Sequence, residues 1–332
     1  MNELWQRLGF LAVALIVYRI GTHIPIPGIN PEQVAALFQQ SQGTILQYFN
    51  LFSGGALERM SIFALSVVPY ISSAIVMQLF SNSLPYLQEL KKDGQSGRNK
   101  ITQYTRYGAV VFAIIQSTAL TITLQTAGLI ESTGLFSAVV AISSIVAGTI
   151  FLMWLGEQIS ERGIGNGISL IIATSIITGV PRAIGQALEQ TQQGDLNYLL
   201  LLILAILSLL VVAFVVFVEN AQRKITVNYA QRNQVRGMIQ APSSFLPLKL
   251  NMSGVIPAIF ASTFLLFPAS LSAWFGNIDG LGGLQEFSLY LNPGQPLYIL
   301  LFVVLIVSFC YIWLALTFNS QDMADNLKRG GA

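Results

Sequence analysis

Eight long apolar stretches with little charge limit what this chain can fold into more than any other feature of the sequence. A helix needs roughly 20 mostly apolar residues to cross about 30 Å of hydrocarbon, where no water can satisfy an open backbone. The stretches therefore predict eight membrane-spanning helices, over residues 4–24, 62–82, 104–125, 135–156, 167–188, 196–218, 253–275 and 296–318.

The composition supports this interpretation and excludes the main alternatives. Of the 332 residues, 53% are hydrophobic and only 10% are charged, whereas a soluble domain carries about 25% charged residues. The single Cys excludes a disulfide scaffold, and the high apolar content excludes a disordered chain. Arg19 interrupts the first stretch and no small-residue cleavage site follows it, so we expect a retained anchor. We predict an all-α membrane protein.

The positions of the 17 Lys and Arg residues predict the orientation of the chain. If the amino terminus lies in the cytoplasm, only Arg19, Arg59 and Arg182 fall on the outer side. Cytoplasmic loops are enriched in basic residues, and the opposite topology would violate that rule at nearly every loop. We therefore predict a cytoplasmic amino terminus.

Two segments between the spans have patterns of their own. Residues 44–60 are apolar but too short to cross the membrane, and they contain the pair Gly54 and Gly55. They are typical of a short helix with a hinge on the outer side, or of a helix lying in the interface. After the sixth span, apolar and polar residues alternate from Ile225 to Tyr229, which predicts a short strand in a basic cytoplasmic hairpin.

The spans offer little chemistry. Their middles carry no charge, which disfavours an ion-coupled transporter. Arg19 and Arg182 lie near outer ends, where we expect their side chains to extend toward water. His23 and Cys310 have no partners that would make a metal site or a catalytic set, and no Walker A motif occurs. We predict no metal or cofactor and no enzymatic activity, so any energy must come from another protein.

Glycines and prolines predict local backbone features. The sequence GIGNG at 163–167 predicts a tight turn, with Asn166 capping the fifth span. Small residues in the fourth span, Gly148 among them, predict close approach of a neighbouring backbone. Pro69 in the second span, and Pro257 and Pro268 in the seventh, predict kinks. The aliphatic residues around these positions are, on composition alone, ordinary packing residues.

Several long motifs, in order along the whole chain, identify a family resemblance. They include FNLFSGGALERMSIFAL, SGRNKITQYTRYG, MWLGEQISERGIGNGIS and PLKLNMSGVIPAIFAS. Together they resemble the SecY family of the bacterial-type Sec translocon. The resemblance implies a bundle of ten spans in two five-helix halves related by a pseudo-twofold axis. Eight of these spans are expected here, five in residues 1–190 and three in 191–332, the latter with a basic loop at 220–250.

The resemblance also implies site residues. The family's pore ring maps to aliphatic residues of the second, fifth and seventh spans, which are Val67, Ile71, Ile168, Ile172 and Ile259. A sixth ring member belongs to the tenth span, which this sequence does not contain. The plug that fills the outer funnel maps to residues 44–60, with Leu46, Phe49, Phe52, Gly54, Gly55 and Leu57. The lateral gate forms beside the spans that hold Pro69 and Pro257.

Two basic cytoplasmic loops resemble the surfaces on which a ribosome or the SecA motor docks. Their basic residues are Lys91, Lys92, Arg98, Lys100 and Arg106 in the first, and Arg223, Lys224, Arg232, Arg236 and Lys249 in the second. Such charge suits rRNA phosphates or an acidic protein surface, although Lys and Arg also set topology. The family further implies SecE and SecG as partner subunits, with signal peptides, nascent polypeptides and membrane lipids as contacts.

The expected function is that of the channel subunit that moves unfolded secretory polypeptides across the bacterial inner membrane and releases hydrophobic spans sideways into lipid. Two alternatives stay open at this point. One is a secondary transporter with broken helices around a site at the middle of the membrane. The other is an inactive membrane scaffold, because two spans of the family pattern are missing from this sequence.

Overall fold

The computed structural model describes residues 2–40, 50–126, 128–129, 134–194, 197–227, 244–262, 264–265, 295–317 and 320–329. The chain forms two compact units. One contains Met1–Gln186 and Thr263–Leu301, and the other contains Ala187–Ser262 and Phe302–Ala332.

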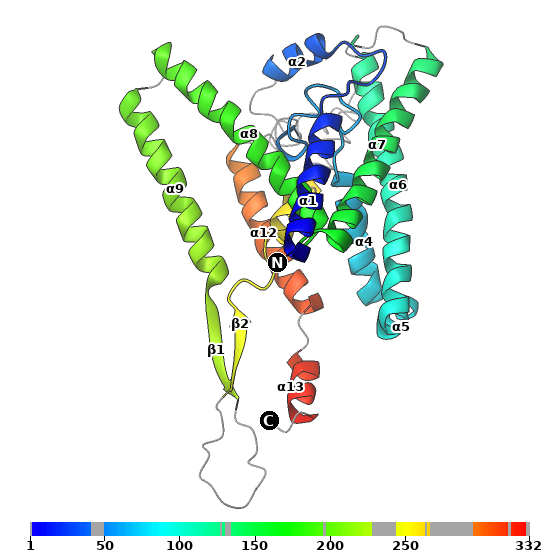
Figure 1. Ribbon diagram of the computed structural model, residues 1–332, viewed down its shortest axis with the longest axis vertical. Coiled ribbons are helices and arrows are strands. Elements are labelled where there is room, and N and C mark those ends of the chain that lie inside the picture. Colours follow the sequence, from blue (N-terminus) through cyan, green and yellow to red (C-terminus); the bar gives the residue numbers. More distant parts are fainter. Residues whose placement is uncertain are drawn as a thin grey trace, which may run out of the picture. The chain divides into compact units, whose positions relative to one another are not determined.

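Helices make up the first unit (Figure 1). Its elements, in chain order, are α1 (Asn2–Gly21), α2 (Pro31–Gln40), α4 (Val68–Ser83), α5 (Pro85–Lys92), α6 (Gly94–Thr126), α7 (Leu135–Arg162) and most of α8 (Gly167–Gln192).

The second unit combines helices with one hairpin. Its elements are α9 (Tyr198–Asn220), β1 (Gln222–Val227), β2 (Ser244–Lys249), most of α12 (Pro296–Thr317) and α13 (Ser320–Arg329). α9 continues almost directly into β1, which pairs antiparallel with β2 (Figure 1). The strand predicted from Ile225 onward is confirmed through Val227, and Tyr229 lies outside the described residues.

Six helices among the described residues are long and apolar enough to cross a membrane: α1, α6, α7, α8, α9 and α12. They correspond to the first, third, fourth, fifth, sixth and eighth predicted spans. Of the seventh, the structure describes helix only at 256–262 and 264–265. The chain is thus a multi-pass, mainly helical membrane protein, as the sequence predicts.

The second predicted span differs from the prediction. Residues 62–67 form turns and not helix, and Ser66 has a positive φ of 51°. α4 begins only at Val68, so its apolar part, Val68–Ser81, is shorter than the other spans. Pro69 lies in the first turn of α4, where its missing N–H needs no partner. The predicted kink at Pro69 is therefore wrong, because this proline starts a helix.

Pro257 behaves in the same way. It lies in the first turn of the helix at 256–262, which is anchored by hydrogen bonds from the backbone N–H groups of Ala258 and Ile259 to Val255 O. The predicted kink there is also wrong, and Pro268 lies outside the described residues. Within the described part of the chain, Pro181 of α8 lies inside a helix, a position for which the sequence predicts no kink.

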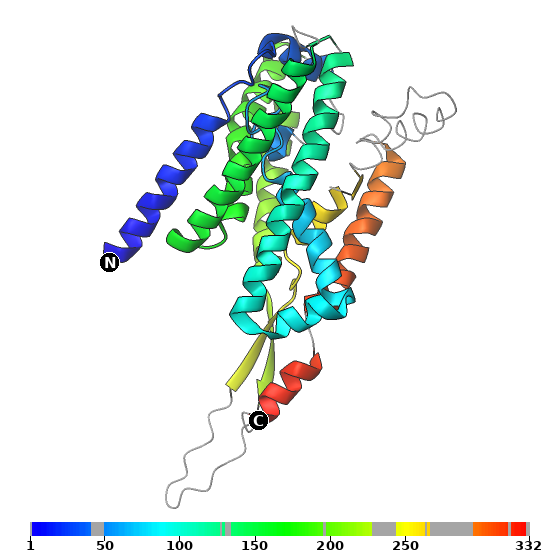
Figure 2. The same ribbon diagram turned by 90° about the vertical axis from the view of Figure 1, so that its right-hand side faces the viewer.

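The first of the two predicted basic loops is helical and not an irregular loop. α5 ends at Lys92 and is capped by Asp93, and α6 starts at Gly94, whose φ of +68° makes the reversal (Figure 2). α6 then runs 33 residues, so it extends the third span well into that region. The loop predicted to carry Lys91, Lys92, Arg98, Lys100 and Arg106 is thus corrected to two helices joined by a sharp turn.

The turn between α7 and α8 follows the prediction. Asn166 Oδ1 accepts hydrogen bonds from the backbone N–H groups of Ile168 and Ser169, at 3.1 and 3.3 Å. The two helices approach so closely that a Cβ at Gly167 would overlap the backbone carbonyl of Gly156. This contact holds the start of α8 against α7.

Candidate functional site

Four of the five predicted ring residues belong to one apolar cluster of the first unit. Val67 is 2% exposed and is part of the cluster, and Ile71, Ile168 and Ile172 pack against it. The sequence spacing explains this, because Val67 and Ile71 are one helical turn apart at the start of α4. Ile168 and Ile172 have the same spacing at the start of α8. The fifth residue, Ile259, lies in the first turn of the helix at 256–262, in the second unit.

The predicted plug segment is described from residue 50 onward, so Leu46 and Phe49 lie outside the described residues. Helix continues only to Phe52 and is followed by turns up to residue 60, so the predicted helix is wrong for this half. Leu57 is buried at 3% exposure. We define residues 50–60 as the turn segment.

Gly54 and Gly55 have structural roles that the hinge prediction did not include. Both have positive φ angles, 65° and 81°. A Cβ at Gly54 would also lie 3.2 Å from the Cα of Ser175 in α8. The glycine pair therefore forms a defined turn in close contact with α8, which a bulkier residue would disturb.

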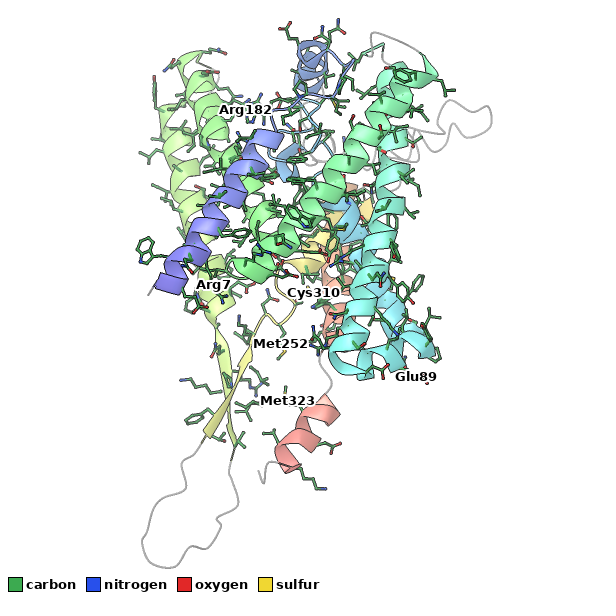
Figure 3. The ribbon with its side chains drawn as sticks, turned by 45° about the vertical axis from the view of Figure 1, so that its right-hand side comes forward. Arg7, Glu89, Arg182, Met252, Cys310 and Met323 are labelled. Carbon is green, nitrogen blue, oxygen red and sulfur yellow. The ribbon has the colours of Figure 1, made fainter. Side chains whose placement is uncertain are left out.

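One carboxylate connects the turn segment to α8. Glu58 is 8% exposed and accepts two short hydrogen bonds from Arg182, at 2.6 and 2.7 Å, and one from Asn50 at 2.9 Å. Arg182 reaches the segment from the carboxy-terminal half of α8 (Figure 3). The expectation that Arg182 simply extends toward water is therefore wrong, since its guanidinium binds Glu58.

The backbone carbonyl of Gly54 accepts hydrogen bonds from two arginines. Arg19 Nη1 and Arg59 Nη2 lie 3.1 and 3.0 Å from this oxygen. The expectation for Arg19 is thus also corrected, because it contacts the turn segment. Nearby, the buried Tyr18 hydroxyl lies 2.6 Å from Ser175 Oγ and 3.2 Å from the carbonyl oxygen of Ser53. α1 and α8 therefore hold the segment from two sides.

The surroundings of Glu58 lower its pKa. Burial raises the pKa of this carboxyl, but hydrogen bonds from Arg182 and Asn50 and the charges of Arg182 and Arg59 lower it, and the net shift is downward from 4.5. A lowered pKa means that the contact adds stability above pH 4.5, and that this is lost as pH falls through the lowered pKa.

We expect acid to weaken this contact selectively. Thermal unfolding in detergent micelles should show Glu58→Gln less stable than wild type at pH 7, with the difference shrinking as the pH falls below the ordinary glutamate pKa. The comparison isolates one carboxylate, because all others titrate in both proteins. A constant difference across this pH range would contradict the assignment.

The predicted docking residues divide into two groups. Arg98 and Lys100 are exposed at the start of α6, but Arg106 donates a 2.7 Å hydrogen bond to Glu157 of α7 and so is engaged within the protein. Lys91 lies on α5, and nothing is described of the Lys92 side chain.

The second group lies on the hairpin. Arg223, Lys224 and Lys249 are exposed, and the register pairs Lys224 with Pro247 and Gln222 with Lys249. Lys224 and Lys249 therefore share one face of the hairpin and Arg223 lies on the other. Arg232 and Arg236 lie outside the described residues.

The remaining candidate groups for metal or proton chemistry have structural partners. His23 Nδ1 lies 2.9 Å from the carbonyl oxygen of Arg19, and Cys310 Sγ lies 3.6 Å from Ser253 Oγ. In the part of the chain that the structure describes, no three His, Cys, Asp or Glu side chains gather where they could hold a metal ion.

Comparisons with known proteins identify the family. The SecY family model matches residues 61–332. The chain is 56% identical to protein translocase subunit SecY of Pseudomonas aeruginosa and 54% identical to that of Escherichia coli K12. Both matches cover the whole of this chain, and they cover 75% of the Pseudomonas protein and 76% of the Escherichia protein.

Solved structures share the fold. A protein-conducting channel matches with a TM-score of 0.65 and 18% identity, over 95% of this chain and 73% of that one. Sec61 of a canine ribosome–channel complex has the same TM-score and identity, over 98% of this chain and 76% of that one. The sequence identities decide the assignment: the chain belongs to the SecY family.

Proposed function

We propose that this chain is the pore-forming subunit of a protein-conducting channel, which passes unfolded polypeptides across the membrane and releases apolar spans into lipid. The observation that carries the proposal is the packing of four candidate ring residues from the starts of α4 and α8 against one apolar cluster, next to the turn segment. The related translocase subunits favour this function over a small-solute transporter or an inactive scaffold.

The chemistry of the ring residues suits such a pore. Aliphatic side chains offer no oxygen to replace the hydration shell of an ion, so a narrow aliphatic throat resists ion flow. The same side chains can move apart around an extended polypeptide without binding a particular sequence. The proposed throat residues are Val67, Ile71, Ile168 and Ile172 in the first unit and Ile259 in the second, and the turn segment belongs to the proposed plug.

The proposal includes orientation and partners. The amino terminus is cytoplasmic, which places the α5–α6 turn and the hairpin on the side where polypeptides enter. Exposed Arg98, Lys100, Arg223 and Lys224 offer charge for an RNA or acidic protein surface. Ribosome and SecA are the proposed sources of driving force, and SecE and SecG the proposed partner subunits. The related Sec61 was solved in a ribosome–channel complex, which supports the ribosome.

Site-specific photo-cross-linking tests the function. A cross-linking amino acid at Ile172 should capture a secretory polypeptide stalled during translocation, whereas the same amino acid at Ile177 should capture lipid or nothing. Ile177 is the matched control because it lies on the same helix and is 65% exposed. Equal capture of the polypeptide at both positions, or at neither, would contradict the proposed pore.

A further inference from the structure

One face of α8, between Ser175 and Arg182, contacts the turn segment. Ser175, Thr178, Gly179 and Arg182 have the spacing i, i+3, i+4 and i+7, so they lie on one side of the helix. A Cβ on Gly54 would lie 3.2 Å from Ser175 Cα and 3.3 Å from Thr178 Oγ1, and a Cβ on Gly179 would lie 3.4 Å from Leu51 Cδ1. We call these four residues the α8 stripe.

Small side chains form the inner part of the α8 stripe, and a charge forms its outer end. The small residues let the backbone of the turn segment come close, but their van der Waals contacts do not fix the orientation of the segment. Arg182 adds a bidentate bond to Glu58, which fixes both distance and orientation. The two parts together define where the segment lies on α8.

Internal hydrogen bonds tie the turn segment together. Asn50 Oδ1 accepts from the backbone N–H of Glu58, while Asn50 Nδ2 donates to the Glu58 carboxylate. The carbonyl of Asn50 accepts from Gly55 N–H and from Ser53 Oγ, and Ser53 Oγ accepts from Leu57 N–H. Because the loop is closed on itself, a bond at Glu58 restrains the entire segment.

The ion pair is the contact best suited to break and re-form. The side chain of Arg182 is 53% exposed, whereas the side chain of Glu58 is 11% exposed. Water can therefore solvate the arginine once it separates, which makes the pair weaker than a fully buried one. The hydrogen bonds within the loop do not need to change when it separates.

We propose that the Glu58–Arg182 ion pair is a latch that holds the turn segment on the α8 stripe in the resting protein and releases it as a preformed unit. Arg19 of α1, which donates to Gly54 O, holds the same unit from the other side, while the bond from Arg59 to Gly54 O lies within the segment. This inference rests on the proposed function only where it treats the segment as the plug.

Hydrogen–deuterium exchange of the full chain in lipid nanodiscs tests the latch. Glu58→Gln and Arg182→Gln should each speed exchange at the backbone amides of residues 51–60 by about three- to tenfold, since charge-assisted bonds are lost from a partly exposed pair. The double variant should exchange no faster than either single variant, because the two residues act through each other. Arg182→Lys keeps the charge but cannot form the bidentate bond, so its exchange rate should lie between those of wild type and Arg182→Gln. This variant also serves as a check in case a glutamine variant misfolds.

The exposed pair Glu3 and Arg7 supplies the control, since their double glutamine variant should leave exchange at 51–60 unchanged. Unchanged exchange in both single latch variants, or multiplied effects in the double variant, would overturn the latch. Ion leak, measured on the same variants, separates the two proposals. Faster exchange together with wild-type ion leak would support the latch but contradict the plug role of the segment.

Discussion

Replacing Ile172 with asparagine should increase the resting ion conductance of the channel several-fold. An amide in the proposed throat offers an oxygen and two N–H groups to a passing ion or water, where the aliphatic side chain offers none. The effect is measured as ion current, or as dye efflux from vesicles, with the channel at rest and no translocating chain.

Ile177→Asn is the control for that experiment, because Ile177 lies five residues along the same helix and is 65% exposed. It introduces the same polar group but away from the apolar cluster, so conductance should stay at the wild-type value. We expect Ile259→Asn, in the second unit, to behave like Ile172→Asn. Wild-type conductance for both ring variants would exclude these residues from the throat.

Replacing Gly148 with alanine should destabilise the protein strongly. A Cβ at this position of α7 would overlap the backbone carbonyl of Ile62, and a backbone atom cannot swing aside as a side chain can. The cost should be about 1–3 kcal/mol or more in the free energy of unfolding, because residues 61–67 and α7 must move apart. Thermal unfolding in micelles measures it as a lower midpoint temperature.

Gly185 of α8 provides the matched substitution. A Cβ there meets nothing within 4 Å. Alanine in this helix interior should therefore stabilise the protein slightly, by about 0.5–1 kcal/mol, through its better helix propensity. Similar midpoint temperatures for Gly148→Ala and Gly185→Ala would show that the close contact at Gly148 does not matter for stability.

Features that depend on neighbouring residues could be predicted from the sequence. Hydropathy over a window of helical length located six spans, and the Asn166 cap depends only on backbone groups two and three residues away. The hairpin strand was visible in the alternation from Ile225 onward, because side chains of a strand alternate in direction. Gly148 was predicted to admit a close backbone, although the sequence did not say that Ile62 would provide it.

The effect of a proline depends on its position in a helix, which the local sequence does not fix. A proline inside a helix kinks it, but a proline in the first turn costs nothing. The sequence around Pro69 is apolar on both sides, so it predicts a continuous span and hides the turns at 61–67. Those turns exist because they pack between neighbouring elements, with Ile62 N–H bonded to Ile24 O and Ser61 paired with Pro25. Propensity could not reveal contacts of that range.

What the sequence determined by itself is six of the membrane helices, because apolar length and backbone hydrogen bonding within one segment suffice for each of them. The tertiary structure alone decided the partners of Arg19, Arg59 and Arg182. Glu58 and Arg182 are separated by 124 residues, and Arg19 meets Gly54 across 35. An ion pair depends on where two distant segments pack, and nothing in the residues beside either charge reports that position.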